Sequence, residues 1–159
     1  MQRIEKIVKH PLFIAHMKRN AESERDRAFC KHDISHALDV ARIMQLMNLE
    51  RSLSAEKEIL YAAALLHDIT KWQQYESDTP HNQSALAPAK EILADTGFTV
   101  GEIDTITYAI LHHRTGPPDE HLYAKLLFEA DKLARPCFFC SAQSHCKRED
   151  SLKNLTARY

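Results

Sequence analysis

The chain has little glycine, no long apolar stretch and almost no net charge. Only 3 of its 159 residues are glycine, and the formal net charge is −1. Runs of alternating valine and threonine, typical of strands, are also scarce, which argues against a sheet protein. Without a charge bias there is no global field to recruit nucleic acid or a membrane surface. No apolar run approaches the ~20 residues that a membrane helix needs.

Cysteine is also infrequent, with four in the chain. The first six residues lack the apolar stretch of a signal peptide, so we expect a soluble cytoplasmic protein. In that compartment the cysteines are expected to be metal ligands or small buried hydrophobes rather than disulfides. The length suits one domain with a core of its own.

Apolar residues recur with the helical period along most of the chain, which predicts an all-α, single-domain bundle. Residues 69–80 and 114–119 are expected to be connections, the first with one turn around Trp72, and Pro88 to kink or start its helix. We place a helical domain at 1–135 and a cysteine-containing extension, packed on the core, at 136–159. The charged end of this extension could form a last short helix. The predicted helices are 3–9, 11–26, 33–49, 54–67, 81–95, 99–113 and 120–135.

Several ionisable residues interrupt the apolar faces of these helices near their ends. The clearest are His67 and Asp68, which follow the uncharged run Tyr61–Leu66. Buried ionisable groups need partners, and a metal ion is a common partner for histidine and aspartate together. Similar positions on other helices are held by His36, His81, His112, His113 and Asp131.

Four of these residues lie in three local motifs with a specific resemblance. The motifs are Ser35–Ala41 around the first histidine, Leu66–Lys71 around the doublet, and Glu129–Leu133 around the last aspartate. Their order resembles that of the HD-domain metal-dependent phosphohydrolases over residues 32–135. The resemblance implies an HD-type helical bundle with a metal site in its core.

His81 and His113 fall where the dinuclear branch of that superfamily carries extra ligands. The layout is similar to HD-type hydrolases of dinucleoside tetraphosphates. The resemblance implies that one metal is held by His36, His67, Asp68 and Asp131, and a second by Asp68, His81 and His113. It also implies cleavage of a phosphate ester or anhydride of a nucleotide or related small molecule by a metal-bridging hydroxide, with Asp68 as the bridging ligand.

The chemistry of the side chains adds further expectations. Ligation rich in imidazole suits Fe, Mn, Zn or Co better than Mg. Lys71, three residues after Asp68, is a candidate to stabilise charge on the substrate phosphate. Arg114 and His112 are candidate substrate contacts, with His112 pointing to another side of its helix. The remaining histidines (His10, His16, His32, His121 and His145) are expected to have no role, although His32 could line the entrance.

Two other functions stay open. Some proteins with this fold and six-ligand order resemble diiron oxygenases, and a non-catalytic nucleotide-binding or scaffold protein is a third alternative. A small phosphate compound is the expected partner; long nucleic acid is less expected. The residues do not define the substrate or the oligomeric state, and a homo-oligomer is possible.

The extension contains the pattern C-x2-C-x5-C at Cys137, Cys140 and Cys146, which resembles most of a zinc site. Cys30 lies six residues before His36, and Cys137 six after Asp131. If those helices are antiparallel, both cysteines leave at the same end and Cys30 could be the fourth ligand of a structural zinc or iron–sulfur site. His145 is the alternative fourth ligand, and four reduced, partly buried thiols are the alternative to any metal.

Overall fold

In the computed structural model, which describes residues 1–159, the apolar helix α4 (Lys57–Leu66) lies inside the bundle. It packs against α1 (Gln2–Lys9), α3 (Ile34–Glu50), α8 (Val100–His112) and α9 (Leu122–Leu133). Every residue in the second half of α4 is buried. Its lack of charge follows from this position, because neighbours cover it on all sides.

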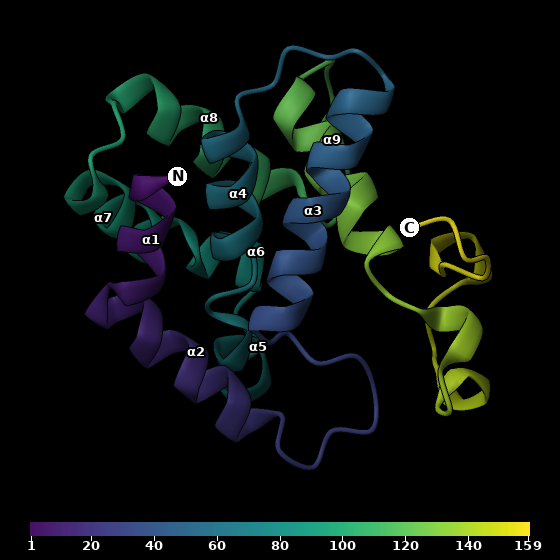
Figure 1. The fold of residues 1–159 in the computed structure, drawn as a ribbon. Coiled ribbons are helices and arrows are strands. Elements are labelled where there is room, and N and C mark those ends of the chain that lie inside the picture. The colour runs from purple at the N-terminus through teal and green to yellow at the C-terminus, as the bar shows by residue number, and fades with distance from the viewer.

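Four more helices complete the bundle. α2 (Pro11–Ser23) packs against α5 (Lys71–Ser77), and α6 (His81–Ser84) leads into α7 (Leu86–Thr96). Figure 1 shows α1 and α7 on one side of α4, and α3 and α9 on the other. The prediction of an all-α protein is confirmed, since the chain contains no strand.

The C-terminal tail, which we define as residues 136–159, lies beyond α9 at the edge of the bundle (Figure 1). It contains three short 3-10 turns, η1 (Cys137–Phe139), η2 (Gln143–His145) and η3 (Asp150–Leu152). The charged end therefore forms a 3-10 turn rather than an α-helix. None of the helices has the length and apolar character needed to cross a membrane.

Some predicted boundaries differ from the structure. The supposed connection 69–80 contains α5, a seven-residue helix around Trp72. The helix predicted at 81–95 is divided at Ala85 into α6 and α7, with Pro88 in the first turn of α7, where a missing N–H has no cost. The helix predicted from Ser54 begins at Lys57.

The helix that carries the first histidine begins where its cap predicts. The Asp33 side chain accepts a hydrogen bond from the His36 backbone N–H at 3.0 Å, so His36 lies in the first turn of α3. Helix α8 begins with a capping box, in which Thr99 and Glu102 bind each other's backbone N–H groups. These caps fix the ends of two helices that carry histidines of the candidate site.

Candidate metal centre

The His67–Asp68 doublet lies in the turn between α4 and α5. Helix α4 ends at Leu66, which lets the two side chains converge instead of pointing about 100° apart as in a continuous helix. Asn20 of α2 holds this turn: its Nδ2 donates to the Asp68 carbonyl, and its Oδ1 accepts from the Trp72 backbone N–H, both at 2.9 Å. Asn20 is 2% exposed, so no water can replace these bonds.

We expect Asn20→Leu to destabilise the protein and to displace Asp68. The substitution leaves a buried carbonyl and a buried N–H with one partner fewer, and each unsatisfied buried group costs about 1–3 kcal/mol. The measurement is chemical denaturation with tightness of metal binding as a second readout. Lys18→Ala, at an exposed position of the same helix, is the control. Equal stability of the two variants would contradict the role of Asn20.

The first group of candidate ligands contains His36, His67, Asp68 and Asp131. One ligand atom from each lies within 4.8 Å of the others, and all four residues are buried. His67 Nε2 is 3.0 Å from Asp68 Oδ2, and His36 Nε2 is 3.2 Å from Asp131 Oδ1. Helix α3, the turn after α4 and helix α9 therefore bring nitrogen and carboxylate oxygen ligands to one point.

The second group contains Asp68, His81 and His113, again with ligand atoms within 4.8 Å of one another. Asp68 Oδ1 is 3.0 Å from His81 Nε2 and 3.6 Å from His113 Nε2. Asp68 thus presents Oδ1 to this group and Oδ2 to His67. The structure brings together the same two sets that the resemblance implied, with Asp68 common to both.

Hydrogen bonds on the far side of the rings determine which nitrogen is free. The Nδ1 atoms of His67 and His113 each lie within 2.7 Å of the backbone carbonyl three residues earlier. Nδ1 must carry a proton to donate there, so Nε2 is the nitrogen that faces the cluster and can bind either a proton or a metal. His81 has the same arrangement, with Nδ1 at 2.5 Å from Gln74 Oε1.

The buried carboxylates and histidines of the site would be stabilised by further positive charge. His67 Nε2 and Asp68 Oδ1 are buried without a hydrogen-bond partner. Burial alone would raise the pKa values of Asp68 and Asp131, yet the charges of His67 and Arg135 hold both well below the usual carboxyl range. Burial alone would lower the pKa of His67, but the two aspartates raise it to about 10. A divalent cation would supply this charge, so the residues fit a metal.

Arg135 is a member of the site that the sequence analysis missed. Its Nη2 is 2.6 Å from Asp131 Oδ1, and the residue is 5% exposed. The spacing of four residues between Asp131 and Arg135 is the signal that could have revealed this pair. Arg135 keeps Asp131 ionised in the position of a ligand.

His32 also lies closer to the site than expected. It is 6% exposed, and its Nε2 is 3.9 Å from Asp68 Oδ2. Its Nδ1 lies 2.5 Å from Glu24 Oε1, an oxygen that also accepts the Tyr75 hydroxyl. His32 is therefore an oriented side chain next to the shared aspartate. No local pattern in the sequence links Glu24 to it.

A cavity of about 330 Å³ opens over both groups. Asp131 is its only acidic lining residue, whereas five lining residues are cationic: Lys71, Arg114, Lys132, Arg135 and Arg148. These cations come from α5, the loop between α8 and α9, the end of α9 and the residues just after it, and the tail. His112 does not line this cavity; its ring packs against Tyr108, with 4.4 Å between the ring centroids.

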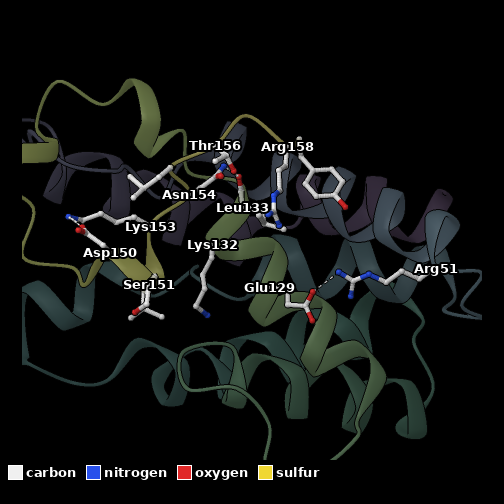
Figure 2. A pocket seen from close by; sticks show the side chains of 13 residues that line it. Arg51, Glu129, Lys132, Leu133, Asp150, Ser151, Lys153, Asn154, Thr156 and Arg158 are labelled. Carbon is white, nitrogen blue, oxygen red and sulfur yellow. Dashed lines mark hydrogen bonds and ion pairs between the residues drawn. The ribbon is translucent and has the colours of Figure 1, made fainter.

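The largest cavity of the protein, about 540 Å³, lies elsewhere, between α9 and the tail. Figure 2 shows Arg51, Lys132, Lys153 and Arg158 around it, with Arg51 paired to Glu129. We assign the candidate site to the smaller cavity because its wall includes His81 and His113 of the second group and Asp131 of the first. The two cavities share Lys132 and Leu152, so a cationic surface continues from one to the other.

The four cysteines lie outside the two ligand groups, although the cavity that three of them line is also lined by His36 and Arg135. All four are free thiols, and Cys30, Cys137 and Cys140 line a third cavity of about 370 Å³. Their sulfurs do not form a group as tight as the two described above.

The protein is a helical bundle with buried histidines and aspartates, and its motifs follow a fixed order. Together these features define a class of metal-binding domain. A family model for the HD domain matches residues 33–135, and the chain belongs to this family. A solved structure of a predicted HD superfamily hydrolase from an uncultured Thermotogales bacterium is similar, with a TM-score of 0.59 and 27% identity. The similarity covers 76% of this chain and 66% of that one.

Sequence relatives extend the comparison. An uncharacterized protein of Clostridium beijerinckii is 44% identical over 159 residues, the full length of both chains. Ribonuclease Y 1 of Pediococcus pentosaceus is 28% identical over 79% of this chain, and ribonuclease Y of Nitratidesulfovibrio vulgaris is 30% identical over 83%. The matches cover only 23% and 24% of the two ribonucleases.

Proposed function

We propose that the protein is a metal-dependent phosphohydrolase that acts on a phosphate ester or anhydride of a nucleotide or a related small molecule. The observation that carries the proposal is the shared Asp68 beneath a cavity lined by five cationic side chains. An anionic substrate would be attracted to those cations and held over the histidine and aspartate cluster.

The two buried groups would each hold a divalent ion, with Asp68 contributing to both. Such ions lower the pKa of bound water and neutralise charge on a phosphoryl group. The cationic side chains of the cavity would bind the remaining phosphate oxygens and orient the reacting phosphorus. Because the cations come from several elements, a substrate with more than one phosphate fits this lining better than a monophosphate.

The test is a phosphate-release screen over mono-, di- and dinucleoside polyphosphates with Mn, Fe and Co, after metal analysis of protein purified without oxygen. We expect activity with at least one polyphosphate compound, and equal rates with and without oxygen. Turnover that requires oxygen and iron would instead support the oxygenase alternative. No turnover with any substrate or metal would contradict the proposal.

RNA is a second candidate substrate, favoured by the relatives named ribonuclease Y. The cationic surface that continues from the site cavity through Lys132 to the larger cavity offers a path for a longer phosphate chain. Single-stranded RNA therefore belongs in the same screen. Cleavage of RNA that weakens steeply with salt, together with no turnover of small nucleotides, would favour this candidate.

Lys71→Met should lower turnover by about 10²-fold, the usual effect of removing one charge-stabilising donor. Lys71 Nζ lies 3.1 Å from His81 Nδ1 at the wall of the site cavity. Methionine keeps much of the side chain's length but removes the charge. Steady-state kinetics should show the loss, and Lys90→Met, at an exposed position of α7, is the control. Unchanged kinetics in Lys71→Met would remove Lys71 from the substrate site.

A further inference from the structure

The C-terminal tail has almost no core of its own. Among residues 136–159 only Cys137 and Asn154 are buried, and Phe139 is 88% exposed. Asn154 binds the tail to α9 through a 2.8 Å bond to the Leu133 carbonyl. Small segments without a core are commonly held by disulfides or a structural metal, and these cysteines form no disulfide.

Short hydrogen-bonded turns separate the three cysteines of the tail. The Cys140 N–H donates to the Cys137 carbonyl, the Gln143 N–H to the Cys140 carbonyl, and the Cys146 N–H to the Gln143 carbonyl. Each cysteine therefore lies at the end of a tight turn, as in C-x2-C metal sites. Cys30 comes from the loop between α2 and α3, and it lines one cavity together with Cys137 and Cys140.

The surroundings of the cysteines are cationic. The charges of Arg135 and Arg148 lower the pKa of Cys30 against the larger opposing effect of burial, and Lys153, whose ion pair is with Asp150, lies near enough to Cys137 and Cys146 for them to raise its pKa slightly. Four thiolates around a metal or cluster carry net negative charge, which such cations offset. Burial raises the pKa of Cys30, so this thiol is not activated as a free nucleophile.

We propose that Cys30, Cys137, Cys140 and Cys146 bind a thiophilic metal centre that fastens the tail to the loop before α3. Four thiolates are the ligand set of both structural zinc and a four-iron cluster. Around one zinc the sulfurs would stand about 3.8 Å apart, given Zn–S bonds of ~2.3 Å, so the tail must move inward to bind it. A four-iron cluster tolerates wider spacing because each thiolate binds its own iron.

This centre would also act on the site cavity. The tail supplies Arg148 and Leu152 to the cavity above the histidine cluster, and the loop before α3 carries His32. A metal that joins the two segments would hold Arg148 and Leu152 at the wall of this cavity and His32 beside Asp68. The inference does not depend on the proposed hydrolysis, because the cysteines and the histidine cluster use different residues.

The experiment compares the metal content of wild-type protein purified without oxygen with that of Cys137→Ser/Cys140→Ser and of Cys30→Ser. An Asp68→Asn background reduces the contribution of the histidine cluster, so the two sites are counted separately. We expect either variant to lose about one zinc, or about four irons with visible absorption that bleaches on reduction. Ser141→Ala/Ser144→Ala, in the same turns, should lose nothing.

Equal metal content in the wild type and in Cys137→Ser/Cys140→Ser would overturn the inference, and metal retained in Cys30→Ser would overturn the role of Cys30. If a variant does not fold, titration of thiols in native wild-type protein decides. We expect the four thiols to react only after a chelator removes the metal. Immediate reaction of the thiols without metal release would overturn the inference as well.

Discussion

Replacing Asp68 with asparagine should reduce turnover by about 10³-fold, because metal-assisted charge stabilisation is worth several kcal/mol and each 1.36 kcal/mol is a factor of ten. Asp68 presents Oδ2 to His67 and Oδ1 to His81. Asparagine has one carbonyl oxygen and no charge, so it cannot serve both groups. We expect metal content to fall by at least one ion per chain.

A readout other than activity makes this prediction sharper. Metal that binds only the folded state raises the melting temperature by mass action. Added Mn²⁺ should therefore stabilise the wild type strongly and Asp68→Asn weakly. Asp104→Asn, at an exposed position of α8, should respond like the wild type. A folded Asp68→Asn variant with wild-type metal response and turnover would contradict the role of Asp68 as the shared ligand.

The residues of the two candidate ligand groups could be found in the sequence because they disturb a local pattern. His36, His67 and Asp131 each occupy a position where the helical period predicts an apolar side chain, and each is buried. Such exceptions are visible in sequence because a buried ionisable group needs a special partner. The motifs around these residues then indicated which of them come together from different helices. The helical period alone does not show this.

The residues that support the ligands could not be predicted in the same way. Asn20 acts on Asp68 and Trp72, about fifty positions along the chain, and Glu24 orients His32 through a loop. A polar residue near the end of an amphipathic helix is ordinary in sequence. Its role depends on which backbone groups the fold brings to it.

Only one turn was predicted where helix α5 lies, because tertiary contacts stabilise this helix. Seven residues are too few for the apolar period to appear, and isolated helices of this length are unstable in water. Arg19 stacks on the Trp72 ring, and Trp72 Nε1 donates to His16 Nδ1 at 3.0 Å. These contacts with α2 hold α5 in place, and with it Lys71 at the wall of the site.

His81→Ala should show whether a second ion contributes to activity. His81 Nε2 is 3.0 Å from Asp68 Oδ1 and 3.0 Å from His113 Nε2, and the His36 group does not include it. Alanine leaves the second group with two ligands and the first group intact. We expect the metal content to fall by about one ion per chain relative to the wild type, and turnover by at least about 10²-fold, since one ion's charge stabilisation is lost.

The control is Gln83→Ala, an exposed neighbour on the same short helix, which should keep both metal content and turnover. A fall in turnover with unchanged metal content would mean that His81 acts on substrate rather than on a metal. Loss of one ion with normal turnover would mean that one ion at the His36 group is sufficient for catalysis. The two measurements together separate a one-metal from a two-metal site, because His81 belongs to only one of the groups that meet at Asp68.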